Sequence, residues 1–214
     1  MPATSGSVDP SEHGDRTQPK RWSTPTLWQW VSYVSAPQLS ATYFFLVLAL
    51  PGSVISIWLA SSVIFATLVP LLILGLMVRL MKVDADVSRR TDRWPIYGLS
   101  VVSYAVGALV LFVTGAPSGM FVLMVAYTVN TILALVVTLC YEKVSAHVWG
   151  VFGPAIVILF FVGASAYTVA ALGGAVTAVS RAKLGRHTAF QIGLTVVLAS
   201  ATTVAVVLAF RNFV

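Results

Sequence analysis

The chain has 214 residues and a net charge of +6, with 58% hydrophobic residues. Only 9% of the residues are charged, against about 25% in an average soluble domain. A soluble fold of this size needs far more polar surface to cover its core, so the composition excludes a soluble globular protein and a disordered one. It predicts an all-α, polytopic membrane helix bundle.

The N-terminal 35 residues come before the first predicted crossing. Residues 1–21 are rich in Ser, Thr, Pro and Gly and predict a disordered polar tail. No charged stretch leads directly into an apolar one there, so we expect no cleavable signal peptide. The segment 22–35 contains four aromatic side chains: Trp22, Trp28, Trp30 and Tyr33. This pattern fits an interfacial segment along the lipid headgroups, or aromatic residues that merely anchor the first crossing.

Four charge-free blocks follow, and each can be counted in helices, because a membrane helix needs about 20 apolar residues. The blocks fit two crossings in roughly 36–80, two in 96–141, two short ones in 144–180 and one in 187–210. We expect breaks at 115–119 and near 163–165. The sequence thus predicts about seven transmembrane segments (six to seven) in a single domain, 36–214.

The charges lie between these blocks. Of the 20 charged residues (13 basic plus 7 acidic), all but Arg211 lie in the tail or in the clusters 79–93, 142–147 and 181–187. Even numbers of crossings separate these clusters, so we expect them on one face. The positive-inside rule makes that face cytoplasmic, in what we expect to be the plasma membrane. The third block is short for two crossings, which predicts that His147 and Arg181 at its ends are recessed at membrane depth, where ionisable groups are functional suspects.

The three clusters combine histidines with several arginines, a set that suits phosphoryl transfer through a histidine nucleophile. Arginines hold phosphate oxygens in bidentate fashion, one histidine attacks phosphorus, and a second protonates the leaving oxygen. Fixed cations, rather than a metal, stabilise the transition state. The single cysteine, Cys140, excludes a disulfide framework and a cysteine-built metal site, and we expect no cofactor and no nucleic-acid partner.

Three motifs stand in order along the chain. Ser180-Arg181 is followed after five residues by His187; Ser145-x-His147 lies upstream, and Arg93-Trp94-Pro95 lies further upstream. Over roughly 80–200, these motifs resemble the third, second and first signatures of the type-2 phosphatidic acid phosphatase superfamily, with Trp94 inserted into the first. The resemblance implies a membrane-embedded, metal-independent phosphatase of lipid phosphates or diphosphates, such as polyprenyl phosphates or phosphatidate-like lipids.

The resemblance also implies roles for individual residues. His187 would be the nucleophile and His147 the general acid. The phosphate-binding residues would be Arg181, Arg93, Arg90, Lys143 and Ser145.

Gln191 stands where the family has an aspartate. Four residues after His187 on a helix, it can accept a hydrogen bond from the imidazole and fix the tautomer. It cannot offset the imidazolium charge, and loss of the orienting carboxylate in a serine-protease triad costs about 10⁴ in kcat. We interpret Gln191 as a trait of a divergent branch with Lys-x-Ser-x-His and His-Thr-x-x-Gln.

Two other functions fit parts of the sequence. A metal-dependent membrane prenyltransferase would hold Mg²⁺ on a diphosphate through Asp84, Asp86 and Asp92, but its second loop offers only Glu142. A catalytically silent lipid-phosphate binder or transporter is favoured by Gln191.

Two further expectations concern the opposite face and the route of the lipid. Pro117-Ser118-Gly119 resembles the second signature by letter, but Met120 replaces its histidine, so we expect a turn. The charge-free segments show no broken, polar-lined path, so we expect the lipid tail to enter sideways from the bilayer.

Overall fold

A computed structural model describes residues 25–50, 56–82 and 90–210, with backbone only for residues 90 and 91. Within these ranges the chain forms helices and no strands. The first five elements are α1 (Leu27–Val34), α2 (Pro37–Ala49), α3 (Ile57–Val63), the π-helical segment η2 (Ile64–Leu68) and α4 (Val69–Met81). The others are α5 (Arg90–Val113), α6 (Ser118–Cys140), α7 (Ala146–Phe161), α8 (Ala164–Lys183) and α9 (Ala189–Phe210). Of the earlier predictions, the tail 1–21 lies outside the described residues.

Several helices are suited to a bilayer. Four are long and apolar enough to cross one: Ile57–Met81, Asp92–Val113, Ser118–Cys140 and Ala189–Phe210. A fifth crossing results if α1 and α2, which meet at 58°, are counted as one bent span. The predicted class, an all-α bundle with apolar helices of membrane-spanning length, is therefore confirmed. Of the two remaining helices, α7 is apolar but has 16 residues, and α8 has 20 with Arg181 and Lys183 in its last turn.

The two predicted breaks are confirmed. One falls between α5 and α6 and the other between α7 and α8, and each contains a glycine with positive φ: Gly115 at 64° and Gly163 at 128°. Glycine adopts this backbone conformation without the steric cost of a side chain. The turn predicted at 117–119 is present only in part: Pro117 is the N-cap of α6, whereas Ser118 and Gly119 are the first two residues of that helix.

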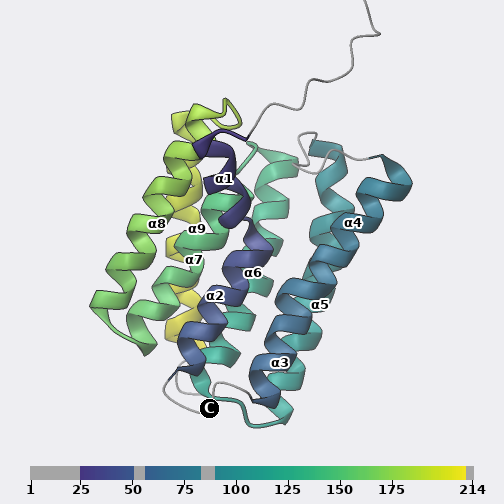
Figure 1. Cartoon of the computed structure of the whole chain (residues 1–214). Helices are drawn as coiled ribbons and strands as arrows, with labels where there is room; N and C mark the ends of the chain where they lie inside the picture. Colours follow the sequence, from purple (N-terminus) through teal and green to yellow (C-terminus); the bar gives the residue numbers. More distant parts are fainter. Residues whose placement is uncertain (1–24, 51–55, 83–89, 211–214) are drawn as a thin grey trace, which may run out of the picture.

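Helix α6 occupies the centre of the bundle. It packs against α5, α7 and α9, and more lightly against α2 (Figure 1). Met120, Leu123 and Met124 on its N-terminal half are fully buried in the main apolar core. The N-terminal end of α6 and the α7–α8 turn lie at one end of the bundle, whereas α1 and the α8–α9 turn lie at the other (Figure 1).

A buried polar contact ties three central helices together. Asn130 on α6 accepts a hydrogen bond from Trp149 Nε1 on α7 at 2.7 Å and donates one to Thr203 Oγ1 on α9 at 2.9 Å. The same amide also donates to the Ala126 carbonyl of its own helix. Each polar group thereby finds a partner in an apolar interior, where an unmade hydrogen bond is costly. The contact fixes the rotation of α7 and hence the position of its first turn.

Helix α1 lies across the C-terminal end of α8. Its N-terminus is closed by a capping box between Thr26 and Gln29. Ser180 Oγ donates to the Trp28 carbonyl at 2.7 Å, and this bond holds α1 against α8. The helix exposes Leu27, Trp30 and Val34 on its outer surface. This apolar surface is equally compatible with a segment that lies along the lipid headgroups and with one that anchors the first crossing.

Candidate functional site

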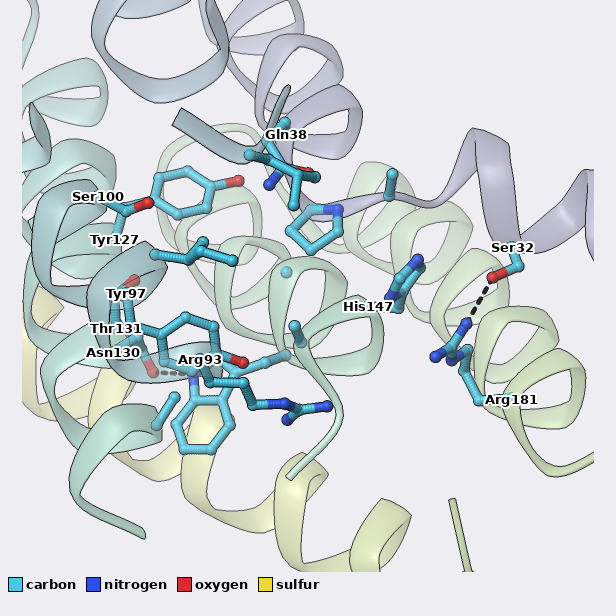
Figure 2. A pocket seen from close by; sticks show the side chains of 18 of the residues that line it. Ser32, Gln38, Arg93, Tyr97, Ser100, Tyr127, Asn130, Thr131, His147 and Arg181 are labelled. Atoms are coloured by element: carbon cyan, nitrogen blue, oxygen red, sulfur yellow. Dashed lines mark hydrogen bonds between the residues drawn. The ribbon is translucent and has the colours of Figure 1, made fainter. Parts of the chain in front are cut away.

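A cavity of about 680 Å³ opens at the end of the bundle that carries α1. Its wall takes residues from α1, α2, α4, α5, α6 and α7, and from the end of α8 through the α8–α9 turn. Figure 2 shows Arg93, His147 and Arg181 around this cavity. His187 also lines it. Residues of all three motifs therefore line one cavity.

Two of the cavity's arginines are deeply buried. Arg93, near the start of α5, and Arg181, in the last turn of α8, are each 3% exposed. Arg93 Nη1 donates to the Val144 carbonyl at 2.7 Å, and Arg181 Nη1 donates to Ser32 Oγ of α1 at 2.7 Å. With these bonds in place, the two guanidinium groups point into the cavity from opposite sides (Figure 2). Two guanidinium groups at one cavity offer N–H donors in a geometry that suits oxyanions, so the cavity can bind negative charge.

His187 lies between α8 and α9, just before the first turn of α9. It is 6% exposed, and its Nδ1 lies 3.2 Å from Gln191 Oε1. Thr188 is the N-cap of α9: its hydroxyl accepts from the Gln191 N–H, and the Gln191 side chain accepts from the Thr188 N–H. The expected contact between His187 and Gln191 is present. It arises from a capping box, however, because His187 precedes α9 instead of lying within it.

Burial is the largest cause that lowers the pKa of His187, from 6.5 to about 4. The positive charges of Arg181, Arg93 and Lys143 lower it further, in that order, and the hydrogen bond with Gln191 raises it slightly. A positive charge nearby disfavours the protonated imidazole. The ring is therefore neutral at neutral pH, which is the form that a nucleophile needs.

His147 lies in the first turn of α7, next to Ala146, and both residues line the cavity. The positive end of the α7 dipole therefore faces the same space as the two arginines. Ser145, one step before, is the N-cap of α7, and its hydroxyl accepts from the Val148 N–H at 3.5 Å. Its own N–H donates to Thr195 Oγ1 of α9 at 3.1 Å, which anchors this loop.

A carboxylate stands behind Gln191. Gln191 Nε2 donates to Glu142 Oε1 at 3.1 Å, and the Lys143 N–H donates to the same oxygen at 2.8 Å. His187, Gln191 and Glu142 therefore form a hydrogen-bonded chain. Glu142 lies 49 residues from Gln191, and its sequence neighbourhood carries no sign of this contact.

Of the other predicted site residues, Gln191, Lys143 and Ser145 do not line the cavity. Ser145 is fully buried and serves as a helix cap, so the structure gives it a structural role. Lys143 does not line the cavity but is close enough for its charge to act on His187. Arg90 begins α5, and its side chain lies outside the described residues, as do Asp84 and Asp86.

The structure adds residues that the sequence did not suggest. Gln29, Ser32 and Tyr33 of α1 line the cavity beside Arg181. The capping-box spacing of Thr26 and Gln29 could have predicted the helix, but no pattern pointed to its place in the site.

The inner wall of the cavity combines polar and apolar side chains. It contains Tyr97, Ser100, Tyr104, Tyr127, Asn130 and Thr131 from the middle of α5 and α6 (Figure 2). Ile96, Leu123 and Ala134 also line it, so the expectation that no polar-lined path runs between the segments stays a prediction. Hydroxyl and amide side chains carry no formal charge, so a count of charges overlooks them.

Among the described residues, no group of three or more His, Cys, Asp or Glu side chains is placed to hold a metal ion. Comparison with protein-family models, curated proteins and solved structures found no match to this chain.

Proposed function

We propose that the chain is an integral membrane phosphatase that hydrolyses a lipid phosphate or diphosphate through a phosphohistidine. The observation that carries this proposal is the convergence of two histidines, His187 and His147, on one cavity with two buried arginines, Arg181 and Arg93. These residues come from α5, α7, α8 and the turn before α9, so their meeting is not a consequence of sequence proximity. The resemblance of the three motifs to the type-2 phosphatidic acid phosphatases supports the same chemistry.

In the proposed first step, the neutral imidazole of His187 attacks phosphorus through Nε2, because Nδ1 is engaged with Gln191. The bond between phosphorus and the lipid oxygen breaks, and His147 gives that oxygen its proton. In the second step, His147 takes a proton from water, which attacks the phosphohistidine and releases inorganic phosphate. Nε2 of His187 is then free of phosphate again, and His147 carries its proton again.

Positive charge in the cavity supports this reaction. Arg93 and Arg181 offer several N–H donors in a geometry that matches phosphate oxygens, and the first turn of α7 adds its dipole. These donors are fixed before the substrate binds, so little reorganisation is needed as charge shifts in the transition state.

We place the lipid in the bilayer and the phosphate in the cavity. The described helices occupy all the segments predicted to cross, and we propose about seven crossings with α1 at the headgroup level. Helix α7, about 24 Å long, is short for a full crossing, which suits a recessed active site. We further propose that this face is cytoplasmic, in the plasma membrane. Residues of α1–α2 on one side and Leu74 with Ile96 on the other line the cavity, and a lipid tail can leave between them.

The decisive test is release of inorganic phosphate from a lipid panel in detergent with EDTA present. The panel contains a polyprenyl diphosphate, a polyprenyl monophosphate, phosphatidate and phosphatidylglycerophosphate. We expect release that survives EDTA and vanishes in His187→Ala. His13→Ala, in the predicted tail, is the matched control and should keep wild-type activity.

The other outcomes point to the competing functions. Activity that EDTA abolishes would favour the metal-dependent transferase. Lipid-phosphate binding without release, by a well-folded sample, would favour the silent binder or transporter.

A further inference from the structure

Given the proposed function, we propose that Glu142 is a positioning residue that acts on His187 through Gln191. Glu142 does not line the cavity and so does not reach the phosphate. It holds the Gln191 amide in the one orientation that keeps the proton of the His187 ring on Nδ1 and leaves the Nε2 lone pair for attack. Through Gln191, Glu142 thereby orients the His187 ring, which is the role of the aspartate that stands at position 191 in the family pattern.

The argument starts from groups whose hydrogen-bonding roles are unambiguous. The Thr188 backbone N–H can only donate, and it donates to Gln191 Oε1 at 3.2 Å. An ionised Glu142 can only accept, and it accepts from Gln191 Nε2 at 3.1 Å. Together these two bonds identify which end of the amide is oxygen. The atom that faces His187 Nδ1 at 3.2 Å is therefore an acceptor, so Nδ1 must be the donor.

A neutral imidazole carries a single N–H. If that proton is on Nδ1, Nε2 is unprotonated and nucleophilic. A flipped Gln191 amide would set its NH₂ group against the Thr188 N–H and its oxygen against the Glu142 carboxylate, and it would favour the opposite tautomer of His187. Glu142 is itself held, because its Oε1 also accepts from the Lys143 N–H at 2.8 Å.

The contact also changes what a carboxylate at position 191 would do. By the family pattern alone, Gln191→Asp or Gln191→Glu would be expected to keep or raise activity. In this structure the new carboxylate would lie within hydrogen-bond distance of Glu142, and two such groups cannot both be ionised. Gln191→Glu, which has nearly the shape of glutamine and preserves the capping box, should therefore lower kcat.

The test compares removal of the Glu142 side chain with its conservative replacement by glutamine. Glu142→Ala should lower kcat about 10- to 100-fold, the usual effect of losing a group that orients a reactive side chain, with KM nearly unchanged. Gln191→Glu alone should lose about tenfold or more. Glu142→Gln keeps a side-chain oxygen that can accept from both the Lys143 N–H and Gln191 Nε2, so kcat should stay within about threefold of wild type. Glu12→Gln, which removes an acid in the predicted tail, is the matched charge control and should stay within about twofold.

A second readout does not depend on activity. The chain has three histidines, so ¹⁵N-histidine labelling of the full protein in detergent gives few ring signals, and His187→Ala assigns the relevant pair. Wild type should show the Nδ1–H tautomer of His187, and Glu142→Ala should show a mixture of both tautomers. If Glu142 served folding alone, its loss would change neither the tautomer of His187 nor kcat per folded molecule.

Each outcome is decisive. If Glu142→Ala changes neither kcat nor the tautomer, or if Glu142→Gln loses as much kcat as Glu142→Ala, Glu142 does not position His187 through Gln191. If the wild type releases no phosphate from any lipid, the proposed function fails, while the tautomer in Glu142→Ala still decides whether Glu142 orients His187.

Discussion

Acidification should destabilise this protein through one side chain, His187. The ring is buried and faces three positive charges, which lower its pKa from 6.5 to about 4. The unfolded chain therefore binds a proton on this ring at a higher pH than the folded chain does. Stability from the neutral ring is fully present above pH 6.5 and is lost as the pH falls toward 4. A tenfold change in proton affinity is worth about 1.4 kcal/mol, so the loss over this window is about 3 kcal/mol.

The assay is thermal or urea unfolding of the detergent-solubilised protein at several pH values between 7 and 4. His187→Gln removes the titrating ring, while the carboxylates that also titrate there are unchanged. The difference between the two pH dependences therefore isolates His187. We expect wild type to lose about 3 kcal/mol more than the variant.

Arg93→Gln provides an internal check. It removes one of the charges that lower the pKa of His187, while its amide can still donate toward the Val144 carbonyl. Because burial and Arg181 act more strongly, the pKa should rise only partway toward 6.5. NMR titration of the His187 ring measures this shift directly. A wild-type pKa near 6.5, or equal pH dependence of wild type and His187→Gln, would refute the assembled cationic site.

Three further predictions concern packing. Gly107→Ala should lower the free energy of unfolding by about 1–3 kcal/mol in a thermal unfolding assay, because its new Cβ would lie 2.7 Å from Phe65 Cβ. Gly98→Ala on the same helix is the control: its Cβ meets nothing within 4 Å, so this variant should be as stable as wild type or more stable. Asn130→Leu should lower the free energy of unfolding by about 1–3 kcal/mol, because the buried indole N–H of Trp149 loses its acceptor. Met120→Ala should cost about 2–5 kcal/mol of stability, since the side chain is 2% exposed, yet phosphate release per folded molecule should stay near wild type. A large loss of specific activity in that last variant would contradict the position of α6.

Much of the helix pattern could be predicted because its physical basis is local. Charges are costly in hydrocarbon, so charge-free blocks mark helices, and glycines near 115 and 163 mark the breaks. Counting charges does not reveal polar side chains that carry no charge. Tyr97, Ser100 and Asn130 line the cavity and are polar without being charged. The length of the block 144–180 also predicts that its helices are short, and α7 has 16 residues.

The candidate site divides in the same way. The motif residues His147, Arg181 and His187 could be singled out from spacing and from their position between apolar blocks. Ser145 was assigned to the phosphate by resemblance, whereas the structure uses it to cap α7. A serine before a helix suits either role, and only the direction of its hydroxyl distinguishes them.

The sequence by itself determined the class of protein, the order of its helices and the end of the bundle at which its ionisable groups gather. These follow from the cost of placing charge in a bilayer, which acts on each segment separately. Only the tertiary structure decided which groups touch. Arg181 meets Ser32 across 149 residues, and Gln191 meets Glu142 across 49. Such contacts depend on how helices pack and rotate against one another, and no local pattern in the chain encodes that.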